Sequence, residues 1–117
     1  MTQLNRNRTN LQYQREFFRV PYRSVVSISK DDETYINHSI IDLSGGGIAF
    51  LAHDEQFVIK DRVKGILYIN RQPITFYAKV VRVSDDGIVS AKYILINEQQ
   101  RCKIVQECMR EQLKYRK

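Results

Sequence analysis

The feature that most constrains this chain is a two-residue alternation of apolar and polar side chains between Tyr22 and Ile96. β-Branched and aromatic residues dominate the alternating segments, which is typical of strands with one buried face. Short polar segments divide the run, and no segment of helical period lies between them. Six strands are predicted, at residues 22–29, 34–43, 47–53, 63–70, 74–84 and 88–96.

The connections between these strands are short. Residues 31–33 and 85–87 carry the acidic and glycine residues of tight turns, residues 71–73 are predicted as another turn, and residues 53–62 as a polar loop. Connections without helices favour antiparallel pairing. A sheet of this length commonly curls into a barrel, which removes exposed edges. The predicted fold class is therefore all-β, a six-stranded antiparallel β-barrel.

The period changes after Ile96 and predicts a C-terminal α-helix over about residues 97–115. Asn97 is the expected N-cap, with Gln100 three residues later as in a capping box. One apolar face is expected to pack on the barrel or on a partner, and it carries Cys102, Val105, Cys108, Met109 and Leu113. Six helical residues span about 9 Å, which is too far for a disulfide between the two cysteines. Both cysteines are therefore expected to be small buried hydrophobes.

The net charge of +6 lies mainly at the two ends of the chain. Residues 1–23 hold five arginines against one glutamate, residues 98–117 hold six basic and three acidic residues, and the middle has nearly balanced charges. A basic arm suits an anionic partner, although basic ends can also serve solubility alone. We expect residues 1–12 to be a flexible basic arm and residues 13–117 to form one domain with the C-terminal helix.

The sequence lacks the patterns that common catalytic and membrane proteins need. His38 and His53 stand outside any metal-ligand spacing, and no nucleophile elbow, Walker loop or paired carboxylate motif is present. No apolar run approaches the roughly 18 residues of a membrane helix, and residues 1–12 do not resemble a secretory signal. We expect a cytoplasmic protein without catalytic activity, cofactor, bound metal or membrane insertion.

Two arginines, Arg15 and Arg19, flank Phe17 and Phe18 just before the first predicted strand. The phenylalanines favour burial, whereas an arginine is costly to bury without a partner. Guanidinium groups match phosphate oxygens and the edge of guanine. The pair can therefore either remain solvated or hold an anionic ligand.

The segment Asp42–Gly47, with sequence DLSGGG, ends the second predicted strand. Asp42 and Ser44 are two residues apart, so both side chains point to one face. The glycines permit close approach of a backbone or a flat ligand. An ordinary turn would use the same residue types, so the segment alone predicts either a turn or a ligand site.

Taken together, the two motifs resemble the PilZ domain family. Arg15-Glu-Phe-Phe-Arg19 matches its RxxxR motif and Asp42-Leu-Ser44-Gly-Gly-Gly47 matches its (D/N)xSxxG motif, in the family's order and about two dozen residues apart. The six strands and the helix extend the resemblance over roughly residues 13–117. The resemblance implies binding of the bacterial second messenger cyclic di-GMP.

The resemblance also implies a role for each matching residue. Arg15 and Arg19 would contact phosphate and guanine, and Asp42 would accept a hydrogen bond from a guanine N–H. Ser44 would hydrogen-bond the ligand, and Gly47 would leave room for it and shape the turn. Arg82, on the fifth predicted strand, matches a position that often flanks a guanine in the family.

Other features of the resemblance concern the ligand number and the partner. Many members carry an arginine directly before RxxxR and bind a stacked ligand pair, whereas Gln14 here favours one ligand per domain. The segment REFFRVP resembles the linker of flagellar-brake-type PilZ proteins. The expected module changes the conformation of its arm on binding, and so regulates a protein partner in the flagellar motor or in polysaccharide synthesis, with motility or biofilm as output. Two alternatives remain: a nucleic-acid-binding barrel, although no nucleic acid polymer is expected as partner, and a PilZ-like adaptor without ligand.

Overall fold

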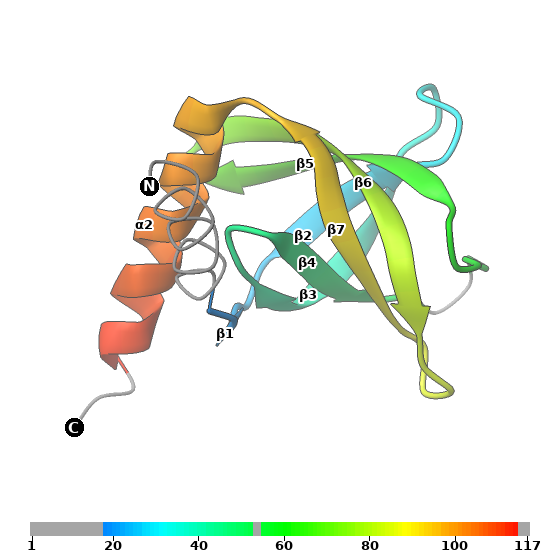
Figure 1. The fold of residues 1–117 in the computed structure, drawn as a ribbon, viewed down its shortest axis with the longest axis horizontal. Coiled ribbons are helices and arrows are strands. Elements are labelled where there is room, and N and C mark those ends of the chain that lie inside the picture. The colour runs from blue at the N-terminus through cyan, green and yellow to red at the C-terminus, as the bar shows by residue number, and fades with distance from the viewer. Residues whose placement is uncertain (1–17, 53–54, 115–117) are drawn as a thin grey trace, which may run out of the picture.

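A computed structural model describes residues 18–52 and 55–114 of the chain, and shows seven strands followed by a helix (Figure 1). The strands are β1 (Val20–Pro21), β2 (Val25–Ser29), β3 (Ile36–Leu43), β4 (Gly47–Leu51), β5 (Arg62–Ile69), β6 (Gln72–Val83) and β7 (Ile88–Ile96), and the helix is α2 (Glu98–Lys114).

Six of the strands close into a barrel in which every pairing is antiparallel. The order is β3-β2-β5-β6-β7-β4, and β4 also pairs with β3, which closes the ring. This confirms the predicted fold class. The two-residue strand β1 adds to the edge of β3, with Val20 opposite Leu43 and Pro21 opposite Asp42. The sequence pattern did not predict β1, because two residues are too few to show an alternation.

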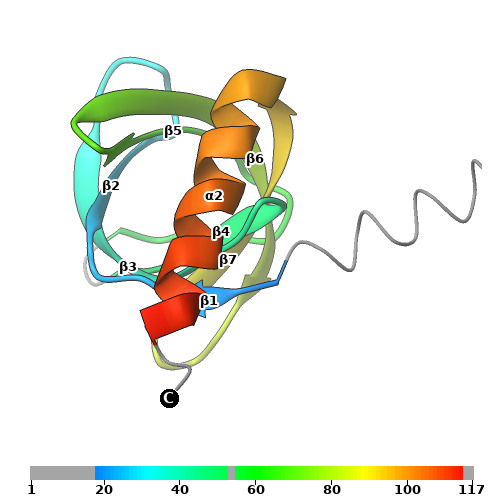
Figure 2. The same cartoon turned by 90° about the vertical axis from the view of Figure 1, so that its left-hand side faces the viewer.

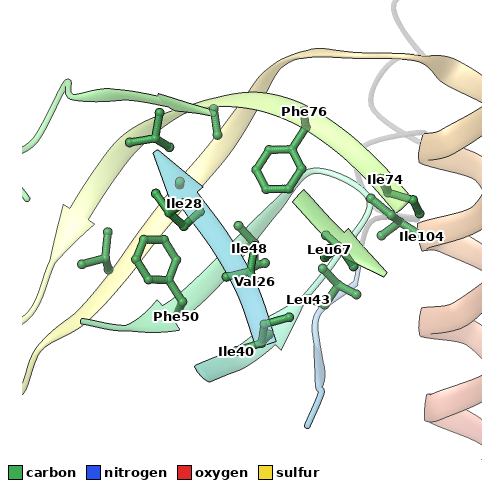
Figure 3. Close-up of a cluster of buried hydrophobic side chains, with 14 of the residues drawn as sticks. Val26, Ile28, Ile40, Leu43, Ile48, Phe50, Leu67, Ile74, Phe76 and Ile104 are labelled. Atoms are coloured by element: carbon green, nitrogen blue, oxygen red, sulfur yellow. The ribbon is translucent and has the colours of Figure 1, made fainter. Parts of the chain in front are cut away.

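The inward side chains of the strands form one apolar core. It includes Val26, Ile28, Ile48, Phe50, Leu67, Ile74 and Phe76, all almost fully buried (Figure 3). Gly65 of β5 lies under the ring of Phe76, and a Cβ built on Gly65 would stand 2.2 Å from the Cζ atom of Phe76. The missing side chain at Gly65 therefore makes the space that this ring fills.

The β5–β6 turn differs from the predicted one. It is formed by Asn70 and Arg71, whose φ angles are 52° and 66°, and Gln72 and Pro73 already belong to β6. Positive φ at both central residues is the geometry of a two-residue hairpin turn, and it matches the twist of the strands. In the turn at 85–87, Gly87 has a φ of 89° and its N–H donates to the carbonyl of Ser84, as the Asp-Gly pair predicts.

The helix begins as the sequence predicts, since the side-chain oxygen of Asn97 accepts hydrogen bonds from the N–H groups of Gln99 and Gln100. It lies across one end of the barrel (Figure 2), and its residue Ile104 reaches Ile74 and Leu67 in the core (Figure 3). Among the described residues, no helix is long and apolar enough to span a membrane.

The packed face of α2 is only partly the expected one. Its buried residues are Ile104, Glu107 and Cys108, whereas Cys102, Met109 and Leu113 are exposed. The expectation that these three residues pack on the barrel was wrong, because it assumed that the packed face contains apolar residues only. Glu107 is buried with a partner, since the hydroxyl of Tyr22 donates a hydrogen bond to its carboxylate at 2.8 Å, and the face that packs on the barrel therefore includes a charged residue.

The space under Phe76 can be tested with a double-mutant cycle. Gly65→Ala should lower the free energy of unfolding by about 1–3 kcal/mol, because the added methyl overpacks the core. In a Phe76→Leu background the same substitution should cost less, since the smaller side chain leaves room, and urea unfolding of the four proteins measures this coupling. Equal costs of Gly65→Ala in both backgrounds would contradict the packing described here.

Candidate ligand-binding site

Strand β1 brings the end of the arm against the motif on β3. Because Pro21 pairs with Asp42, the side chain of Arg19 reaches Asp42, and its Nη1 atom lies 2.8 Å from the Asp42 Oδ1 atom. The Arg19 and Asp42 side chains are 48% and 29% exposed. An ion pair this exposed typically contributes about 0–1 kcal/mol. Breaking this ion pair so that both side chains can contact a ligand would therefore cost little free energy.

A β-bulge sets the direction of Asp42. Ile40 pairs with Phe50 and Asp42 with Ala49, so Ile41 is the extra residue on β3. Ile40 and Leu43 are both buried in the core although they are three residues apart, which a regular strand does not allow. The bulge therefore leaves Ile41 and Asp42 together on the outside of the barrel.

The hydroxyl of Ser44 holds the turn that follows. Ser44 is buried, and its Oγ atom accepts hydrogen bonds from the N–H groups of Gly46 and Gly47, both at 3.1 Å. The Ser44 N–H donates to the carbonyl of Gly47 at 3.0 Å. The structure thus shows Ser44 as an organiser of the turn, and a contact between Ser44 and a ligand stays a prediction.

Gly47 has a packing reason to be glycine. A Cβ built on it would lie 2.4 Å from the backbone oxygen of Ala91 on β7. A backbone atom cannot move aside as the end of a side chain can, so any larger residue would push β4 away from β7 at the point where their pairing begins. Room for a ligand at Gly47 remains a prediction.

Contacts from β7 and α2 hold the turn from behind (Figures 1 and 2). The Arg101 guanidinium donates to the Gly45 carbonyl at 2.8 Å, the Tyr93 hydroxyl to the Ser44 carbonyl at 3.2 Å, and the Cys108 thiol to the Leu43 carbonyl at 3.4 Å. Three consecutive carbonyls of the motif are thus satisfied by side chains far along the sequence. Sequence reasoning missed Arg101 and Tyr93, because no local signal marks which side chains meet this turn.

The groups behind the turn titrate at high pH. Burial raises the pKa of the Cys108 thiol to about 12, with the carboxylates of Glu107 and Glu111 adding to the effect. Burial also raises the pKa values of Tyr93 and Tyr22, and the hydrogen bond to Glu107 adds to the shift at Tyr22. These groups therefore stay neutral and act as hydrogen-bond donors at physiological pH.

Strand register places Arg82 in line with Asp42 on the outer surface. Asp42 pairs with Ala49, Ala49 with Ser90, and Ser90 with Arg82. Directly paired residues share a face, and three strand spacings amount to about 14 Å. Between the charged residues at the two ends of this row lie the small side chains of Ala49, which is buried, and Ser90, which is half-buried.

The predicted site residues therefore have different outcomes. The structure brings Arg19, Asp42 and the turn from Ser44 to Gly47 together, and puts Arg82 at the far end of the same row. Arg15 lies outside the described residues. The row also contains Ser90, and the exposed Lys92, which pairs with Gly47, lies in the neighbouring row. The two-residue spacing of Ser90 and Lys92 predicts from the sequence that they share one face of a strand. Only the pairing of β7 with β4 shows that this face lies next to the motif.

Comparison with known proteins agrees with this architecture. The sequence profile of the PilZ domain matches residues 13–110. No curated protein sequence matches the chain significantly. Among solved structures, the chain is similar to the Bacillus subtilis inhibitor of motility MotI/DgrA, at 22% identity and a TM-score of 0.78, over 86% of this chain and 52% of that one.

Two further similar structures contain a ligand. The PilZ domain of YcgR from Escherichia coli with cyclic di-GMP is 13% identical, with a TM-score of 0.64, over 86% of this chain and 92% of that one. The K. pneumonia MrkH–cyclic di-GMP complex is 15% identical, with a TM-score of 0.69, over 84% and 52%. The chain thus spans about half the length of MotI/DgrA and of MrkH.

Removing the Arg101 guanidinium should loosen the turn. Arg101→Ala should speed amide hydrogen exchange at Gly46 and Gly47, and should lower the free energy of unfolding by about 1–3 kcal/mol, as for a lost hydrogen bond from a charged group. Arg101→Lys should have a smaller effect. Lys103→Ala on the same helix is the control, and equal exchange rates in both alanine variants would show that Arg101 does not hold the turn.

The raised pKa of Cys108 predicts a loss of stability in alkali. The unfolded thiol ionises near its ordinary pKa of 9.0, whereas the folded thiol ionises near 12, so its contribution is complete below pH 9.0 and is lost as the pH rises towards 12. Urea unfolding between about pH 8 and about pH 11 should show a shallower decline for Cys108→Ser than for the wild type.

The exposed Cys102 offers the matched control for this titration, since Cys102→Ser should leave the decline unchanged. Tyr22 and Tyr93 add a decline of the same sign above their ordinary pKa of 10.0, and it remains in both variants. Identical declines for the two serine variants would contradict the role given to Cys108.

Proposed function

The chain belongs to the PilZ domain family, and we propose that it is a cyclic di-GMP receptor that binds this ligand on the outer surface of the barrel beside Arg19 and Asp42. The observation that carries the proposal is the exposed Arg19–Asp42 pair, held by β1 at the motif turn. Two similar structures, of YcgR and MrkH, contain cyclic di-GMP, which supports the same ligand here.

The chemistry of the row fits a dinucleotide with two phosphates and two guanines. Arg19 is suited to phosphate oxygens or to the O6 and N7 atoms of guanine, which a guanidinium binds with two parallel hydrogen bonds. The Asp42 carboxylate accepts hydrogen bonds only, and so it selects the N–H edge of a guanine. Arg82, at the far end of the row beyond Ala49 and Ser90, would flank the second guanine.

Arg15 completes the proposed site from the arm. It is four residues before Arg19, so the two guanidinium groups can approach opposite sides of one anionic ligand. With Gln14 preceding Arg15, one ligand per domain is the proposed stoichiometry.

The proposed switch follows from the unequal strength of the contacts around the motif. Contacts of Arg101, Tyr93 and Cys108 hold the turn from behind, and β1 fixes the backbone at Val20, whereas the guanidinium of Arg19 pairs with Asp42 at the exposed surface. A ligand that engages both Arg19 and Asp42 replaces this pair and reorders the arm, while the barrel stays in place. A protein partner then recognises the new position of the arm.

Calorimetry with cyclic di-GMP tests the proposed site. Arg19→Ala should weaken binding by at least about 2 kcal/mol, or roughly thirtyfold in Kd, because it removes charge-assisted hydrogen bonds. Arg19→Lys should also weaken binding, since an ammonium group cannot make the paired contact. Arg23→Ala is the matched control, because it removes the same charge from an exposed arginine four residues away.

Two results would contradict the proposal. One is binding by Arg19→Ala that equals binding by the Arg23→Ala control. The other is tighter binding of a single-stranded oligonucleotide than of cyclic di-GMP, with a steep dependence on salt, which would favour the nucleic-acid-binding alternative.

A further inference from the structure

A second surface, on the outside of β5, β6 and β7, has features that the ligand site does not use. β6 and β7 shift register between Tyr77 and Ala78, because Tyr77 pairs with Leu95 and Ala78 with Tyr93. Ile94 is therefore the extra residue of a bulge, and Ile94 and Leu95 are 48% and 66% exposed. Bulges change the direction in which side chains point. Here the bulge leaves two adjacent apolar side chains exposed to solvent.

Four basic residues surround this apolar pair. Leu95, Tyr77 and Lys64 form one row across the sheet, and Lys92, Lys79 and Arg62 form the next. Within residues 18–52 and 55–114, no ion pair involves any of the four cations. The surface thus combines exposed apolar side chains with four cations, which outnumber the carboxylates of Asp31 and Asp32 that also line it.

The surface is also hollowed. Arg62, Lys64, Tyr77, Ile94 and Leu95 line an open groove of about 640 Å³. From Lys64 on β5 to Leu95 on β7 there are two strand spacings, or about 10 Å. A helix with its side chains is about 10–12 Å across, so the groove matches the width of one helix.

We propose that this groove is a docking site for an acidic amphipathic helix of a partner protein. The apolar face of such a helix covers Ile94, Leu95 and Tyr77, and its carboxylates reach the two lysines and the arginine of the neighbouring rows. This mode of recognition places an apolar stripe in a groove and uses flanking charge to set its direction.

Charge and shape exclude the other occupants. A second copy of this chain would bring like charges together if it docked through the same face. A flat bilayer cannot fill the hollow of the groove.

The site goes beyond the proposed receptor function, and it can be tested without cyclic di-GMP. The probe is an acetylated and amidated peptide of about 18 residues, or five helical turns, with leucines on one face and glutamates beside them. In nuclear magnetic resonance titrations of the ¹⁵N-labelled protein, the peptide should shift amide signals at residues 62–64, 77–79 and 92–95. A peptide with lysines in place of the glutamates should shift none of these signals.

Variants with matched controls separate the apolar contribution from the charge contribution. Leu95→Glu and Lys79→Glu should each raise the dissociation constant of the peptide at least tenfold. Leu113→Glu, at a leucine that is 62% exposed on α2, and Lys103→Glu should bind it as the wild type does. Raising the salt concentration should weaken binding to the wild type.

Three outcomes would overturn the proposal: no amide shifts up to millimolar peptide, shifts that map to another surface, or equal binding by Leu95→Glu and Leu113→Glu. Binding of phosphatidylglycerol vesicles that Leu95→Glu abolishes, without binding of the peptide, would assign the surface to a membrane instead. Failure of cyclic di-GMP to bind would leave each of these results unchanged, so the two proposals fail separately.

Discussion

The antiparallel pairing of β3 with β4 closes the barrel, and the position of every functional side chain depends on it. Without this pairing both strands would be edges of an open sheet, and Asp42 would not lie in one row with Ala49 and Arg82. Two local departures from a regular sheet make the closure possible: the bulge at Ile41, and the missing side chain of Gly47 against the backbone of Ala91. The DLSGGG segment is therefore both the closing turn of the fold and the proposed ligand motif.

In the proposed receptor, this double use combines a turn held by many contacts with an arm that can respond to the ligand. Behind the turn, the donors of Arg101, Tyr93 and Cys108 satisfy three buried carbonyls, and losing any one of them would leave a buried polar group without its partner. In front, the β1 pairing and the buried side chain of Val20 fix the backbone, while the side chain of Arg19 is held by its exposed pair with Asp42. A ligand at this surface therefore competes with the weakest contact of the site and leaves the strong contacts intact.

Much of the fold was predictable because its signals are local. The six barrel strands, the cap at Asn97 and the turn at Gly87 follow from alternation, side-chain chemistry and tolerance of positive φ. The errors also have physical reasons. The β5–β6 turn was placed too late because Asn70 and Arg71 adopt positive φ without a glycine, and the packed face of α2 was misjudged because Glu107 is buried to meet Tyr22.

The sequence by itself determined the barrel, the helix and the two motifs that suggest the ligand, since strand period, capping and motif spacing are properties of neighbouring residues. Only the tertiary structure decided which of these residues meet. Arg101 reaches Gly45 across 56 positions, and Arg82 joins the row of Asp42 through three successive pairings. The exposure of Ile94 and Leu95 likewise depends on a bulge that shifts one strand against another. Turn geometry sets register within a hairpin, but the alternation along one strand does not show where a bulge will shift it against its neighbour.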